Sequence, residues 1–126
     1  MRIQMRLSYE ARVVLEEIKL NYLKEGVKKT SGSILDDIFK DFKNRVNEID
    51  WDFIIHHAEY TGILADYTEV NPTTLNLSKE TIEIIEVFRD FLNMKLNMKR
   101  TVYRSYIIRV VLKAYKIELE GTNINL

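Results

Sequence analysis

The stretch RIQMRLS at residues 2–8, followed by YEARVVLEEI at 9–18, decides the fold of this chain. In its first part polar and apolar residues alternate, with the apolar ones at Ile3, Met5 and Leu7. A period of two predicts a strand with one buried face. Ser8 suits a helix N-cap, because its hydroxyl can accept an orphan backbone N–H of the first turn. We therefore expect a short strand that leads directly into an amphipathic helix over about residues 9–25.

The same order of signals occurs twice in the chain. When Ser78 is placed over Ser8, Leu77 falls on Leu7, and the apolar positions of the two following segments agree. The second strand opens at Pro72, a place where a missing backbone N–H is tolerated. Its helix is expected over about residues 79–97.

Each copy continues into a second amphipathic helix. These helices are expected over residues 31–46 and 102–117. Thr30 or Ser31 can cap the first of them and Thr101 the second. Gly26 suits the end of the helix before the first turn. The chain therefore reads as strand, helix, helix, and then the same again.

A connector joins the two copies. We expect a short helix from Asp50 to Tyr60 that stops at Gly62, and extended chain over 63–70. The tail from Gly121 is expected to be loose. The predicted organisation is a first unit, a connector, a second unit and a tail, over residues 1–46, 47–71, 72–117 and 118–126.

The composition bounds the class of protein. The 126 residues include no cysteine, 46% are apolar, and the net charge is zero, which predicts a globular chain without disulfides. No signal peptide or membrane helix is expected, so we expect a soluble, cytoplasmic protein. The charge is uneven, at +3 over 1–30, −6 over 31–70 and +3 over 71–126. An acidic middle between basic ends can still present one basic face.

Strand, serine, long helix, short turn and threonine-capped helix together resemble the ribbon-helix-helix family of MetJ/Arc-type repressors. The resemblance covers both copies, about 90 of the 126 residues, and leaves out the connector. Two units in one chain look like the tandem transcription regulators of archaeal filamentous viruses. The resemblance implies a mainly α fold with a short antiparallel β-ribbon. It also implies a prokaryotic or viral DNA-binding regulator, such as a repressor, that acts in the cytoplasm of its cell or host.

A lone strand of six residues can neither bury its apolar face nor satisfy its backbone groups. In the resembling family two protomers pair their strands antiparallel and interlock four helices beneath them. We expect Arg2–Leu7 to pair with Thr73–Leu77 of the same chain, which would make one chain an intramolecular pseudo-dimer. The alternative is that each unit pairs with its copy in a second chain.

The resemblance implies that the outer face of the ribbon enters the DNA major groove. By alternation this face carries the expected base-reading residues Arg2, Gln4, Arg6, Thr74 and Asn76. Arginine can bond guanine, and glutamine can bond adenine. The two half-sites on DNA should differ, with stronger readout by the first strand. The open alternative is that the polar residues of the first strand are merely its solvent face.

The resemblance also implies phosphate contacts where each second helix begins, because free N–H groups and the helix dipole favour an anion there. The candidate phosphate-binding residues are Lys28, Lys29, Thr30, Ser31 and Gly32 in the first copy and Lys99, Arg100, Thr101 and Arg104 in the second. Helix capping beside a solvated charge run is the alternative for these residues.

An enzyme is not expected, and neither is a cofactor or metal. The chain has no phosphate-binding loop, nucleophile motif or zinc-ligand spacing. His56 and His57 would diverge by roughly 100° on a helix, so a surface or packing role is expected. Trp51 and Phe53 are expected to be core or partial core. A solvated helix face is expected for Asp36, Asp37 and Asp41.

Two other functions compete with a transcription regulator. The first is an antitoxin-like protein-binding adaptor, although only about ten residues follow Lys116 to wrap a partner. The second is a DNA-architectural accessory protein, which would use the same surface. The expected partners are double-stranded DNA and further copies of the chain along it, with no membrane.

Overall fold

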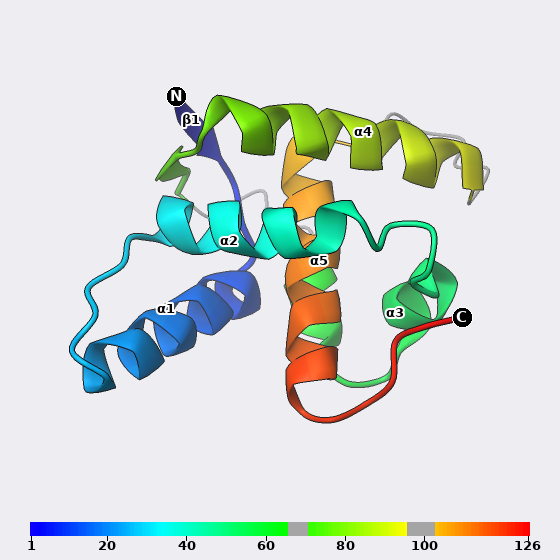
Figure 1. The fold of residues 1–126 in the computed structure, drawn as a ribbon, viewed down its shortest axis with the longest axis horizontal. Coiled ribbons are helices and arrows are strands. Elements are labelled where there is room, and N and C mark those ends of the chain that lie inside the picture. Colours follow the sequence, from blue (N-terminus) through cyan, green and yellow to red (C-terminus); the bar gives the residue numbers. More distant parts are fainter. Residues whose placement is uncertain (66–70, 96–102) are drawn as a thin grey trace.

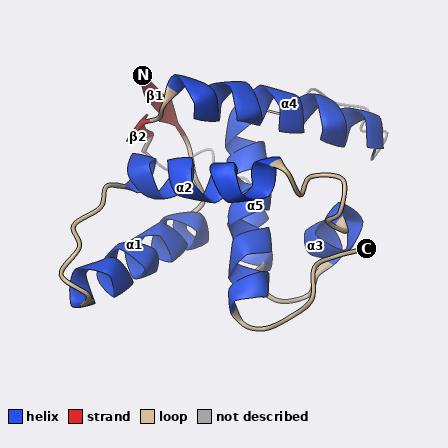
Figure 2. Ribbon diagram, viewed as in Figure 1, coloured by secondary structure: helices blue, strands red, loops and turns tan. Residues whose placement is uncertain are grey.

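The computed structural model describes residues 1–65, 71–95 and 103–126, and this part of the chain is mainly helical with one small antiparallel sheet (Figure 1, Figure 2). The elements in chain order are strand β1 (Arg2–Met5), helices α1 (Tyr9–Lys24), α2 (Ser31–Lys43) and α3 (Trp51–His56), the 3-10 helix η1 (Thr61–Leu64), strand β2 (Thr73–Asn76), and helices α4 (Lys79–Lys95) and α5 (Arg104–Leu119). Within the described ranges, no helix is both long and apolar enough to cross a membrane.

The two strands pair with each other within the chain. Their antiparallel register runs from Arg2 opposite Asn76 to Met5 opposite Thr73. The side chains that point inward from the strands and the residues after them are almost fully buried, namely Met5, Leu7, Leu75 and Leu77. The predicted pairing of the first strand with the second in one chain is confirmed over these eight residues.

The helices of the first copy begin where the sequence places their caps. The Ser8 hydroxyl accepts the Ala11 N–H at 3.1 Å, and the Thr30 hydroxyl accepts the Ser33 N–H at 3.1 Å. Gly26 follows the end of α1 with a φ of 80°, a left-handed conformation that glycine adopts without a Cβ penalty. The predicted start of α1, start of α2 and end of α1 are confirmed.

The start of α4 has a cap from its own chain segment and a second one from α2. The Ser78 hydroxyl accepts the Thr81 N–H at 3.1 Å. The carboxylate of Asp36 on α2 accepts the Ser78 N–H at 3.0 Å and the Thr81 hydroxyl at 2.6 Å. The expectation that Asp36 lies on a wholly solvated face is therefore wrong, because this carboxylate joins the two copies.

Replacing Asp36 by alanine should destabilise the fold by about 1–3 kcal/mol, because the half-buried start of α4 loses a charged hydrogen-bond acceptor. Urea unfolding of Asp36→Ala measures the loss. The neighbouring Asp37→Ala is a matched control, since Asp37 makes an exposed ion pair with Lys29, and such pairs contribute about 0–1 kcal/mol. Equal losses in the two variants would contradict the cross-helix cap.

Helix α5 stands at the centre of the molecule (Figure 1) and begins later than predicted. It starts at Arg104 with Tyr103 at the N-cap and no side-chain cap bond, and it continues to Leu119. The predicted start aligned Thr101 as a cap with Thr30 of the first copy, which lies 71 residues earlier. The buried positions follow an offset of 73 instead, since Ile107, Ile108 and Val111 are buried in the places of Ile34, Leu35 and Ile38.

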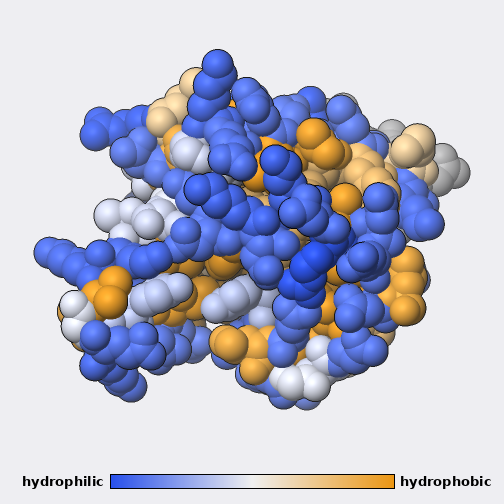
Figure 3. All heavy atoms as spheres, viewed as in Figure 1, coloured by the Kyte–Doolittle hydropathy of each residue, from blue (hydrophilic) through white to orange (hydrophobic). Residues whose placement is uncertain are grey.

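An aromatic cluster unites α2, α3 and α4 in one core. The Phe88 ring lies 5.8 Å from Phe39 and 6.0 Å from Trp51 between centroids, and Phe42 lies 6.3 Å from Trp51. All four side chains are at most 2% exposed, so the two copies and the connector share their core. The expectation of a core position is therefore confirmed for Trp51. It is wrong for Phe53, which is 36% exposed. On the outside, hydrophilic residues cover most of the face seen in Figure 3.

The connector differs from its predicted structure. Helix α3 ends at His56 rather than near Tyr60, and Gly62 belongs to η1 rather than stopping a helix. The chain is expected to be extended from residue 63, but Ile63 and Leu64 belong to η1. Ile63 is fully buried there, and its carbonyl accepts a hydrogen bond from the Ser8 hydroxyl at 2.8 Å. Residues 66–70, the rest of that segment, lie outside the described residues.

The tail was expected to be loose, and this was wrong. Ile124 is 1% exposed, and Asn125 forms an antiparallel bridge with Ile49 of the connector. The Asp50 N–H donates to the Ile124 carbonyl at 2.8 Å. One apolar side chain and a pairing backbone edge are enough to fix the tail on the connector.

Two cations of α5 are buried beneath the connector. Arg109 donates to two carbonyls at the end of η1, at 2.9 and 2.8 Å. Lys113 is 0% exposed and donates to the carbonyls of Ile55 and His57 at 3.3 and 3.0 Å. Burial lowers the pKa of Lys113. The two bonds from Lys113 satisfy carbonyls at the C-terminal end of α3, where the helix dipole favours a cation.

Candidate nucleic-acid interface

The outward face of the ribbon carries the five residues predicted to read bases. Arg2 and Gln4 on β1 are exposed, as are Thr74 and Asn76 on β2, and Arg6 is exposed just beyond β1. The burial of the opposite face fixes this arrangement, because a slip of one residue would turn every apolar side chain outward. The structure therefore brings these polar side chains together on one surface.

Helix α2 begins directly against this ribbon. A Cβ on Gly32 would lie 2.1 Å from the carbonyl oxygen of Asn76, so the approach requires a residue without a side chain. Gly32 is accordingly buried. This close contact places Thr30 and Ser31, at the helix start, beside the end of the ribbon that carries Asn76.

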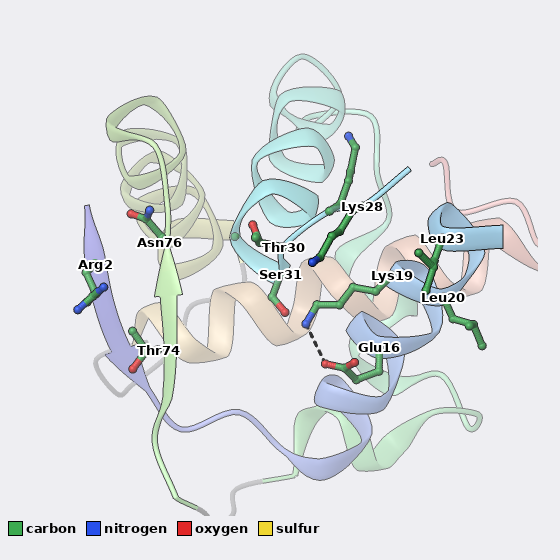
Figure 4. A pocket seen from close by; sticks show the side chains of 12 residues that line it. Arg2, Glu16, Lys19, Leu20, Leu23, Lys28, Thr30, Ser31, Thr74 and Asn76 are labelled. Carbon is green, nitrogen blue, oxygen red and sulfur yellow. Dashed lines mark hydrogen bonds and ion pairs between the residues drawn. The ribbon is translucent and has the colours of Figure 1, made fainter. Parts of the chain in front are cut away.

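A groove of about 720 Å³ lies between this end of the ribbon, α1 and the start of α2 (Figure 4). We call it the lysine groove, and it is lined by Arg2, Glu16, Lys19, Leu20, Leu23, Lys28, Lys29, Thr30, Ser31, Gly32, Thr74 and Asn76. In Figure 4, Lys19 and Ser31 point toward each other between α1 and α2. Four cations and one carboxylate line the groove, so its charge favours an anion.

Two lysines of this groove already have carboxylate partners. Lys29 bonds to Asp37, and this hydrogen bond raises the pKa of Lys29. Lys19 lies 2.9 Å from Glu16. Lys19 was not among the residues predicted from the sequence, although its spacing of three residues from Glu16 on a helix is a usual one for an ion pair.

A second groove of about 480 Å³ lies at the other end of the ribbon, beside α4 and the start of α5. We call it the arginine groove, and it is lined by Ile3, Gln4, Met5, Arg6, Arg89, Tyr103, Arg104 and Ser105. Glu86 forms ion pairs with Arg89 and Arg104, each at 2.7 Å, and accepts a hydrogen bond from Arg104. Arg104 was predicted as a phosphate contact and Arg89 was not. The other candidates of this copy, Lys99, Arg100 and Thr101, lie outside the described residues.

Each groove is lined by the cation of an ion pair, and the two ion pairs are equivalent. Glu86 and Arg89 stand 70 residues after Glu16 and Lys19, the same offset that relates Ser78 to Ser8. Each pair joins residues three positions apart on the first helix of its copy. The repeat in the sequence is therefore also a repeat of charged contacts beside the ribbon.

Among residues 1–65, 71–95 and 103–126, no group of three His, Cys, Asp or Glu side chains could hold a metal ion. His56 is exposed beside Asp52 at 3.3 Å, and the His57 ring lies 5.0 Å from that of Phe53.

Comparisons with protein-family models, with curated proteins and with solved structures find no match to this chain.

Proposed function

We propose that the chain is a transcription regulator that binds double-stranded DNA sequence-specifically through its β-ribbon. The observation that carries this proposal is the shared outward face of Arg2, Gln4, Arg6, Thr74 and Asn76. The DNA major groove admits a two-stranded ribbon, and arginine, glutamine and asparagine match the hydrogen-bonding edges of guanine and adenine. A purely solvated strand face would not need flanking basic grooves at both ends.

The proposal includes a tandem ribbon-helix-helix architecture in which one chain acts as a pseudo-dimer. The intrachain register supports it, and so do the serine caps that start α1 and α4. The equivalent ion pairs of the two grooves fit an approximate twofold relation between the copies. In this arrangement the ribbon has two ends, and each end meets one half of the DNA site.

The basic grooves would hold the DNA backbone on either side of the inserted ribbon. Phosphate contacts fix the register and orientation of a protein on DNA, and base contacts supply the specificity. Among the predicted phosphate contacts, the charged ones that line the grooves are Lys28 and Lys29 in the lysine groove and Arg104 in the arginine groove.

Replacing Lys28 and Lys29 together by glutamine should weaken binding to all duplexes alike. The slope of log Kd against log salt concentration should fall by about 0.9 for each phosphate that the variant no longer neutralises. Fluorescence anisotropy over a salt series measures it. The matched control is Lys40→Gln with Lys43→Gln, which removes the same charge from α2 away from the ribbon. Equal slopes in the two double variants would contradict a phosphate contact in the lysine groove.

Selection from a library of random duplexes tests the proposed function. The duplexes retained by the purified protein should share a motif, and footprinting on the selected duplexes should protect that motif. A retained pool whose sequences match the input composition would contradict sequence-specific binding.

A further inference from the structure

Because β1 and β2 are antiparallel, each end of the ribbon combines residues of both copies. The two halves of the base-reading face are therefore the two ends of the ribbon and not the two strands. Gln4 lies opposite Thr74, and the repeat offset of 70 makes these two residues equivalent. The pseudo-twofold axis of the proposed architecture therefore passes between them. Arg2 lies opposite Asn76 at one end, while Arg6, the equivalent of Asn76, lies at the other. Each end thus has one arginine from the first copy.

The partners of those arginines differ. Arg2 has the amide side chain of Asn76 across the ribbon. At the other end, β2 begins at Thr73 and is preceded by Pro72. The proline ring has no hydrogen-bonding group to offer a base. The first end therefore places an amide across the ribbon from its guanidinium, and the second end has Pro72 in the corresponding place.

The two flanking grooves also differ, in the type of basic side chain that lines them. The groove beside Arg2 and Asn76 is lined by lysines, and the groove beside Arg6 by Arg89, Arg104 and Tyr103. A guanidinium makes planar bidentate bonds to phosphate, whereas an ammonium acts as a point charge. Because both strands belong to one chain, every molecule has one end of each kind.

We infer that the chain binds a non-palindromic DNA site in a single orientation. The inference rests on the proposed function and specifies the substrate of the same site. The half-site under Arg2 and Asn76 contains a guanine and an adenine contact, since arginine matches guanine and asparagine matches adenine. The half-site under Arg6 contains a guanine contact, and Pro72 adds no hydrogen bond to a base beside it. The two bound orientations are therefore unequal in energy.

Directed cleavage of DNA tests the orientation, and the absence of native cysteine makes single attachment sites available. Lys24 and Met94 are exposed, lie in the last turns of α1 and α4, and are equivalent by the 70-residue offset. Each of Lys24→Cys and Met94→Cys would carry an iron–EDTA chelate on a duplex selected by the wild-type protein. Lys24→Cys should cut on one side of the footprint and Met94→Cys on the other.

Cuts of comparable strength on both sides from each variant would overturn the single orientation while leaving DNA binding intact. A wild-type protein that gives no footprint on any selected duplex would overturn the proposed function, and this inference with it.

Discussion

Replacing Gln4 and Arg6 together by alanine should reduce the preference for the selected duplex over a random duplex by at least roughly thirtyfold. Each bidentate base contact contributes about 1–3 kcal/mol of discrimination, and the double variant removes two of them. Binding to random duplex should persist and stay salt-sensitive, because the phosphate contacts are retained. Competition binding with the two duplexes at one salt concentration measures the ratio.

Asn44→Ala with Lys40→Ala is the matched control for this variant. It also removes one amide and one cation from the surface, but at the end of α2 away from the ribbon. Its preference for the selected duplex should equal that of the wild-type protein. If the Gln4 and Arg6 variant keeps its preference while its thermal unfolding is unchanged, the ribbon does not read the bases.

Replacing Phe88 by alanine should destabilise the protein by about 3–5 kcal/mol, the usual cost of emptying a buried aromatic position. Phe88 is 1% exposed and touches both the α2 and the α3 part of the aromatic cluster. Since whole domains are stable by only about 5–15 kcal/mol, DNA binding should also decline with the folded fraction. Urea unfolding measures the change.

The neighbouring Val87→Ala is the control for Phe88→Ala. Val87 is 60% exposed, so its truncation should change stability by no more than about 0.5 kcal/mol. If both variants unfolded at the same urea concentration, the aromatic cluster would not be the centre that joins the two copies and the connector.

Elements with strong local signals could be predicted from the sequence. The alternation at Ile3 and Met5 and the hydroxyls of Ser8 and Thr30 act within a few residues, so strand, caps and first helices lie near their predicted positions. The five base-reading candidates lie on one face for the same reason, because alternation alone determines which side chains point outward.

Contacts between distant segments could not be predicted. Asp36 and Lys113 are charged residues on amphipathic helices, and nothing near them in the sequence shows that they bond to Ser78 or to the end of α3. The tail has a single buried residue, Ile124. A single apolar residue forms no periodic pattern, so its burial could not be predicted from the sequence. Thr101 follows Ser78 at nearly the distance at which Thr30 follows Ser8, so the sequence predicted a helix start at Thr101. The buried apolar residues after Arg104 determine instead where α5 lies.

Some residues of the two grooves could be predicted from the sequence, and others could not. The lysines at 28 and 29 could be found by their position before a capped helix, whereas Lys19 and Arg89 could not. They stand in the middle of long helices, and only the packing of those helices beside the ribbon gives them a place in the site. Their equivalence under the repeat was nevertheless present in the sequence, together with Glu16 and Glu86.

The binding of duplex DNA is the central claim, and an anisotropy titration of a labelled random duplex of about 20 base pairs tests it most directly. At roughly 50 mM salt the wild-type protein should bind in the micromolar range or tighter, and the affinity should fall steeply as salt is raised. Anisotropy that stays flat up to about 100 μM protein at this low salt, where phosphate contacts are strong, would contradict the claim.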